Sequence, residues 1–172
     1  MYVCDSKRVF CTGFNYYGQC GISNSVDELL ERYEEIEMPL ENSEKIVSVS
    51  CGMNHNVALT THNRVIFWGN VTQNQYPNFK TTFGHDLTYT GALPLVLPLQ
   101  NSEKITKIKA YVNRTLVFTD KDRVLIVGGE DASKYHGLPK INYVDLASDK
   151  FFEGKRIVDV ALGVWHTAVL VE

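Results

Sequence analysis

An internal repeat constrains the fold of this chain more than any other feature of its sequence. The segment PLENSEKI at residues 39–46 recurs as PLQNSEKI at residues 98–105, so seven of eight residues are identical at an offset of 59. The element Arg-Val-x-x-x-Gly occurs three times, beginning at Arg8, Arg64 and Arg123. A chain that repeats at such an interval is predicted to fold as a row of similar supersecondary units.

A third repeated element divides the chain into units. The pattern Ile-x-x-Val-x-x-Gly-x-x-His begins at Ile46 and again at Ile157. Its middle copy is degenerate, because Tyr111 and Arg114 stand where glycine and histidine would be. The sequence therefore predicts a single domain built from three units, at roughly residues 1–56, 57–115 and 116–172.

Each unit has the pattern of a small β-sheet. Residues 46–50 alternate apolar and polar side chains, residues 57–60 are apolar, and residues 64–68 are β-branched and aromatic. A fourth strand is predicted at residues 95–99, and its Pro98 favours an edge position because proline cannot donate to a central ladder. We therefore predict an all-β fold, a partial β-propeller of about three four-stranded blades.

Several linked motifs resemble those of a known family, the regulator of chromosome condensation repeat. The motifs are Gly13-Phe14-Asn15, Gly18-Gln19-Cys20-Gly21, Gly52-Met53-Asn54-His55 before Ala58-Leu59, and Trp68-Gly69-Asn70. Cys20 replaces the usual leucine, and the second and third units lack the Gly-Gln-Leu-Gly element. The resemblance implies a scaffold or adaptor that binds other proteins, or alternatively a guanine-nucleotide exchange factor for a small GTPase with chromatin association.

The repeat also raises the question of ring closure. Propellers generally need four to eight blades to close, so about three units are expected to form an open arc. The phase of the repeat predicts that the chain begins with the outer half of one blade and ends with the inner half of another. Two alternatives could cover the open edges: a head-to-tail homodimer, or completion of the ring by another chain.

Residues 25–38 depart from the repeat and are predicted to form a short inserted helix. Ser25 and Glu28 match a capping box, and apolar residues recur at helical spacing. The opposite face is acidic and includes Glu31, Glu34 and Glu35. This face could be an ordinary solvated surface, or it could dock a basic protein partner.

A second departure is the long connection over residues 70–93. Long loops in compact domains often carry function, and aromatic side chains among polar ones are typical of protein interfaces. The alternative is that the aromatic residues fold back over a hydrophobic edge. The candidate partner-binding residues here are Tyr76, Phe79, Phe83, His85 and Tyr89.

Nothing in the sequence points to catalysis. His55 and His166 occupy the same slot of different units, so they are expected to be structural rather than catalytic or metal-binding. We therefore expect no enzyme activity, no cofactor and no metal. The net charge of −3 makes a nucleic-acid partner unlikely, and without a long apolar run no membrane association is expected. An intracellular location, cytoplasmic or nuclear, is predicted.

Overall fold

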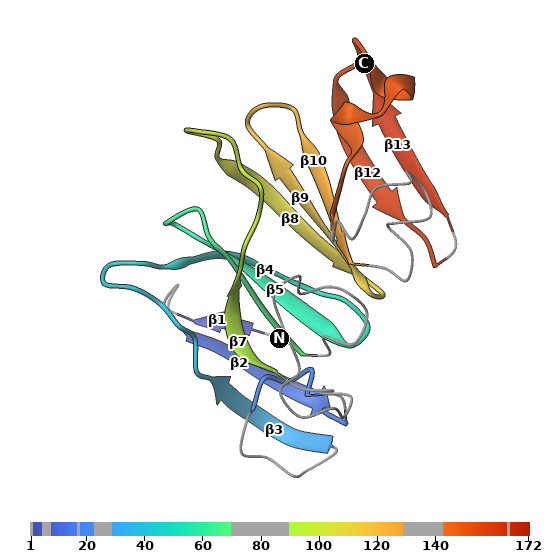
Figure 1. Ribbon diagram of the computed structural model, residues 1–172. Helices are drawn as coiled ribbons and strands as arrows, with labels where there is room; N and C mark the ends of the chain where they lie inside the picture. Colours follow the sequence, from blue (N-terminus) through green and yellow to red (C-terminus); the bar gives the residue numbers. More distant parts are fainter. Residues whose placement is uncertain are drawn as a thin grey trace, which may run out of the picture.

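The computed structural model describes residues 2–4, 8–16, 18–22, 29–69, 90–128, 143–164 and 166–172, which form four antiparallel sheets (Figure 1). The first sheet has the order β1 (Tyr2–Cys4), β2 (Arg8–Phe14), β3 (Leu29–Ile36). The second has the order β4 (Ile46–Cys51), β5 (His55–Thr60), β6 (Val65–Gly69), β7 (Thr90–Leu95). The third contains β8 (Ile105–Tyr111), β9 (Arg114–Thr119), β10 (Val124–Gly128) and β11 (Tyr143–Asp145), and the fourth contains β12 (Ile157–Leu162) and β13 (Thr167–Val171).

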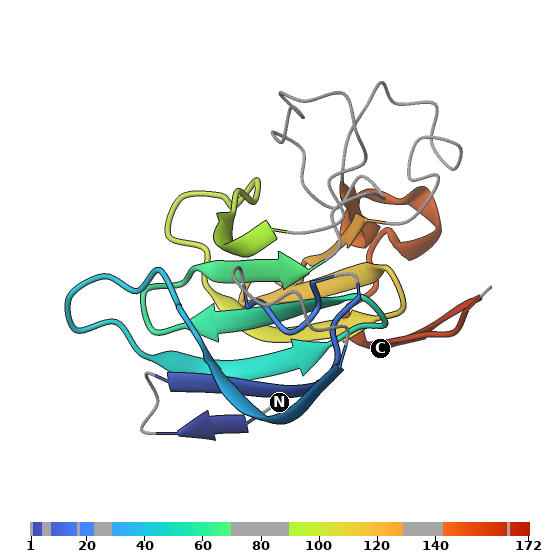
Figure 2. The same ribbon diagram turned by 90° about the horizontal axis from the view of Figure 1, so that it is seen from below.

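The four sheets follow one another in a row and pack face to face. Figures 1 and 2 show the first sheet (blue) at one end and the fourth (red) at the other. Alternate side chains of β6 point to opposite faces: Ile66 and Trp68 join a core cluster with the first sheet, while Val65 and Phe67 join a cluster with the third. Small antiparallel sheets that each pack face to face on the next have the arrangement of propeller blades, so the predicted partial β-propeller is confirmed.

The glycine of the Arg-Val-x-x-x-Gly element has the same backbone conformation in all three copies. Gly13, Gly69 and Gly128 have φ values of 109°, 102° and 89°. These values lie in the region that L side chains rarely adopt, so the repeat keeps glycine at this position. At Gly69 a Cβ atom would also lie 2.5 Å from the carbonyl oxygen of Asn54, which adds a steric reason.

The helix predicted over residues 25–38 is wrong, because residues 29–36 form the strand β3. This strand pairs with β2, whose outer edge would otherwise lack hydrogen-bond partners. Leu30 and Ile36, which the helical pattern assigned to an apolar stripe, instead bury their side chains in the cluster with the second sheet. Strand pairing and packing thus override the helical periodicity of the segment.

The proline-bearing edge strand exists, but it lies earlier in the chain than predicted. Strand β7 spans Thr90–Leu95 and contains Pro94 rather than Pro98. It is the outermost strand of its sheet, in agreement with the argument that proline suits an edge.

Two short 3-10 segments, η1 (Leu146–Ser148) and η2 (Lys150–Phe152), follow β11. Among the described residues, none of the helical segments has the length and hydrophobicity needed to cross a bilayer.

Candidate functional site

The predicted partner-binding residues fall into two groups. Glu31, Glu34 and Glu35 lie on β3, the outermost strand of the first sheet, and all three side chains are exposed. The structure therefore brings these acids together on a strand rather than on a helix. The aromatic group lies outside the described residues: Tyr76, Phe79, Phe83, His85 and Tyr89.

Most of strand β3 is exposed. Only Leu30 and Ile36 are buried, while the five consecutive residues 31–35 are exposed. Pairing with β2 is interrupted there: Cys11 pairs with Glu34 and Gly13 with Leu30, so three residues of β3 oppose one of β2. A bulge of this kind bends the strand locally, and pairing is regular again from Glu34 to Ile36.

Exposed apolar and aromatic side chains accompany these acids, and the sequence analysis missed them. Phe14 at the end of β2 is 54% exposed and pairs across the sheet with Leu29, which is 56% exposed. The Phe14 ring stacks on Tyr16 with 6.2 Å between ring centroids. Tyr33 on β3 is 66% exposed. The available signal was strand alternation, which places Phe14 on the face opposite Val9 and away from the core.

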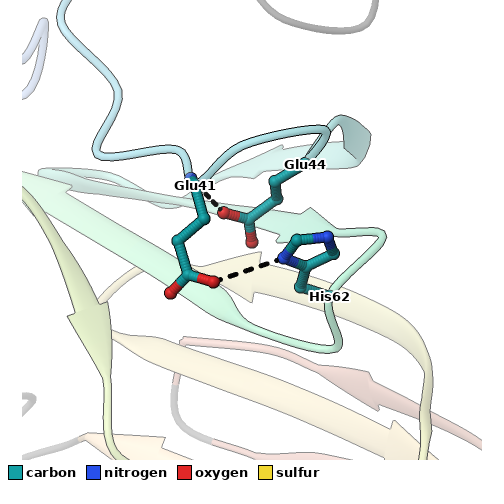
Figure 3. A group of neighbouring side chains, drawn as sticks. All are labelled: Glu41, Glu44 and His62. Carbon is teal, nitrogen blue, oxygen red and sulfur yellow. Dashed lines mark hydrogen bonds and ion pairs between the residues drawn. The ribbon is translucent and has the colours of Figure 1, made fainter.

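A second group of neighbouring polar side chains consists of Glu41, Glu44 and His62 (Figure 3). Glu44 is buried and accepts hydrogen bonds from the backbone N–H of Glu41 (2.8 Å) and from the hydroxyl of Thr60. Arg64 contacts both carboxylates. Burial alone would raise the pKa of Glu44, but these hydrogen bonds and the charge of Arg64 outweigh it and lower the pKa below its ordinary value.

The next blade repeats this arrangement, which indicates a structural role. Buried Glu103 accepts a hydrogen bond from the backbone N–H of Gln100 at 2.6 Å and pairs with Arg123 at 2.6 Å. Arg123 also contacts Asp145 at 2.7 Å, so its planar guanidinium bridges two carboxylates. A metal ion at the Glu41–Glu44–His62 group would have to share its ligands with Arg64. The geometry therefore favours a repeated ion-pair network that fixes the turn before β4 and the turn before β8.

His55 connects two neighbouring blades. Its Nε2 lies 3.0 Å from the hydroxyl oxygen of Thr115, so a residue of β5 contacts a residue of β9. The imidazole is 1% exposed and stacks on Phe67 at 5.5 Å between centroids. Burial lowers the pKa of His55 to about 4, which keeps the ring neutral at physiological pH. These contacts support the predicted structural role of His55.

The innermost strands of the third and fourth sheets are joined by charges. Lys109 on β8 donates to the carboxylate of Asp159 on β12 at 2.7 Å, and Lys107 does so at 3.2 Å. Hydrogen bonds from Lys109, from the backbone of Val160 and from Lys107, together with the charge of Lys109, lower the pKa of Asp159 to about 2, although burial opposes this. The lysines also lie over the ring of Phe118. These pairs link two blades, and they form no recognisable catalytic constellation.

Two buried thiols lie in the core of the first blade. Cys11 and Cys20 belong to the same cluster, and the Cys20 thiol lies 3.6 Å from the carbonyl oxygen of Phe14. A hydrogen bond from the Cys20 thiol lowers the pKa of Cys11 to about 7, and the same contact, together with burial, raises that of Cys20. Both side chains are nearly inaccessible, so they act as core residues.

Comparison with known proteins shows which repeat the first part of the chain matches. Two models of the regulator of chromosome condensation (RCC1) repeat match residues 7–59 and residues 46–75. The ultraviolet-B receptor UVR8 of Arabidopsis thaliana is 32% identical over 40% of this chain and 14% of its own length. The serine/threonine-protein kinase Nek9 of Mus musculus is 26% identical over 99% of this chain and 18% of its own length. The chain thus spans less than a fifth of either relative.

Solved structures show the same fold. Human WBSCR16 matches with a TM-score of 0.67 and 22% identity over 88% of this chain and 38% of its own. Prp20p of Saccharomyces cerevisiae, which was studied for its binding to Gsp1p and histones, matches with a TM-score of 0.65 and 18% identity over 92% of this chain and 38% of its own. Residues 7–75 therefore match the regulator of chromosome condensation (RCC1) repeat, and the described chain shares the propeller fold of these solved structures.

Proposed function

We propose that this chain is a non-catalytic protein–protein interaction module, a scaffold or adaptor built from propeller blades. The observation that carries the proposal is the exposed surface of the first blade, where Phe14, Leu29 and Tyr33 lie with the acids of β3. Exposed aromatic side chains beside charged ones are the residue types that protein interfaces favour. Loops and edges held on a rigid scaffold are where propellers and similar folds carry binding residues.

Cross-blade hydrogen bonds support the scaffold part of the proposal. The side chain of Asn63 on the second blade accepts from the backbone N–H of Ile105 at 2.6 Å and donates to the carbonyl of Glu103 at 2.9 Å. Ser50 accepts from the backbone N–H of Ala110 at 2.8 Å. Contacts of this kind, together with the shared core clusters, hold neighbouring blades in a fixed orientation.

Quantitative affinity capture tests the proposal. The purified chain is immobilised and exposed to cell lysate, with a structurally intact propeller of unrelated sequence as the control. We expect proteins to be retained in near-stoichiometric amounts and to be released by excess free chain. Retention no greater than that on the control propeller would contradict the proposal.

The alternative is guanine-nucleotide exchange on a small GTPase. It is supported by the fold shared with Prp20p, a protein that was studied for its binding to Gsp1p. Exchange requires no bond-making residue, because it works by binding the nucleotide-free state more tightly than the loaded state. A nucleotide-release assay against a panel of small GTPases separates the two functions. Stimulated release would support exchange. If high micromolar protein stimulates no release, exchange is excluded and the scaffold proposal remains.

Completion of the ring by a second copy or another chain stays a prediction.

A further inference from the structure

The outer edges of the first three sheets differ in how they are protected. In the second sheet the edge strand β7 contains Pro94, which cannot donate a hydrogen bond to an added strand. In the third sheet the edge strand β11 is only three residues long. In the first sheet β3 is eight residues long, contains no proline and, among the described strands, pairs only with β2. Short edges and proline are two of the common protections against strand addition, and β3 has neither; its protection is limited to its charges and to the bulge at residues 31–33.

The charge on β3 restricts what could pair with that edge. The strand carries Glu31, Glu34 and Glu35 against a single arginine, Arg32. Within the described part of the chain, no ion pair joins these three acids to a cation. A second copy of β3 would place glutamates opposite glutamates, which is unfavourable. A strand rich in lysine and arginine would instead place opposite charges across the new ladder.

We propose that the outer edge of β3 binds an extended Lys/Arg-rich segment of a partner protein, which adds to the first sheet as a further strand. This inference rests on the proposed function, since it names the chemistry of the partner that the module would bind. The backbone groups on the open edge of all eight residues of β3 are available for the new ladder, which the bulge at residues 31–33 interrupts.

The exposed ring of Tyr33 also favours a Lys/Arg-rich partner segment. Tyr33 lies on β3 between Glu31 and Glu34, and its ring is 66% exposed. A lysine or arginine side chain that lies along this strand can pair with a glutamate and also pack its charged head over the tyrosine ring. An acidic or purely apolar segment would gain neither contact.

Fluorescence anisotropy with a defined peptide tests the proposal. The probe is a labelled ten-residue peptide of alternating lysine and valine, titrated with the whole chain at low and at physiological salt. The test variant is Glu34→Lys with Glu35→Lys, and the matched control is Glu153→Lys with Glu172→Lys, which changes the net charge equally at exposed positions elsewhere. We expect the test variant to weaken binding at least tenfold and the control to change it less than twofold.

A second probe separates strand addition from simple charge attraction. The same peptide, N-methylated at every residue, keeps its charges but cannot donate backbone hydrogen bonds, and we expect it to bind at least tenfold more weakly. Equal binding of the two peptides, or equal loss in both double variants, would overturn the proposal. So would light scattering that shows a dimer which dissociates in the Glu34→Lys/Glu35→Lys variant. If the peptide does not bind but affinity capture retains partner proteins, the proposed interaction module is supported and only the inference about β3 is wrong.

Discussion

His55 and Thr115 lie on neighbouring blades, and Nε2 of the first contacts the hydroxyl oxygen of the second at 3.0 Å. Both side chains are buried, at 1% and 2% exposure. A buried polar contact between blades is favourable only while both partners are present, because an unpaired polar group keeps its desolvation cost. This pair therefore reports directly on whether neighbouring blades pack as described.

Replacing Thr115 with valine should destabilise the fold without changing its shape. The substitution keeps the volume of the side chain but leaves Nε2 of buried His55 without its partner, at a cost of about 1–3 kcal/mol. Urea denaturation measures the change in the free energy of unfolding. The matched control is Thr167→Val on β13, where the side chain is exposed and the expected change is below about 0.5 kcal/mol. Equal effects of the two substitutions would contradict the contact.

The free energy of unfolding should fall as the pH falls from 6.5 toward 4. In the unfolded chain His55 takes up a proton near its ordinary pKa of 6.5, whereas in the folded chain burial lowers that pKa to about 4. The unfolded state therefore binds more protons in this window, and the loss reaches about 3 kcal/mol at roughly 1.4 kcal/mol per pH unit.

Denaturation at a series of pH values checks this linkage. His55→Gln should remove about one proton from the difference between the folded and unfolded states in this window. A parent and a His55→Gln variant with the same pH dependence would show that His55 is not buried in its neutral form.

Arg123→Lys should cost more stability than Arg156→Lys. Arg123 is largely buried and its fork contacts Glu103 and Asp145, so a lysine cannot make both contacts and leaves a buried carboxylate underpaired. We expect a loss of about 2 kcal/mol. Arg156 pairs with Glu172 at exposed positions, where water screens the pair and its loss costs little stability. Thermal unfolding compares the two variants, and equal losses would contradict the structural role of the network.

Gly69→Ala should destabilise the chain more than Gly13→Ala. Both glycines have φ above 100°, so alanine is strained at either position. Only at Gly69 would the new Cβ also meet backbone, at 2.5 Å from the carbonyl oxygen of Asn54, whereas nothing lies within 4 Å at Gly13. We expect a loss of about 1–2 kcal/mol at Gly13 and a clearly larger one at Gly69 by urea denaturation. The reverse order would contradict the packing between β5 and β6.

Much of the fold could be predicted from the sequence because positions that need a particular backbone conformation recur in each copy of the repeat. The glycine at or next to the end of β2, β6 and β10 recurs because each copy needs the same positive φ. The same holds in the turns, where Ser43 and Ser102 both have positive φ at the repeat offset. An element that must satisfy the same backbone geometry several times leaves a visible pattern in the sequence.

The candidate site could be predicted only in part, because residues 25–38 occur once. Without a second copy, the apolar spacing of Leu30 and Ile36 fitted a helix as well as an edge strand, and only the open edge of β2 decides between them. The acids Glu31, Glu34 and Glu35 were correctly expected to be exposed. Their neighbour Phe14 was missed because its exposure depends on the pairing of β2 with β3, a long-range contact that local sequence does not specify.

Amide hydrogen exchange with and without the lysine–valine peptide tests the central claim most directly, because it locates the bound segment on the chain. The account predicts slower exchange in β3, residues 29–36, on binding, with little change in the proline-protected strand β7. Protection confined to other segments, or none at all under conditions where the peptide is bound, would contradict β3 as the docking edge of this module.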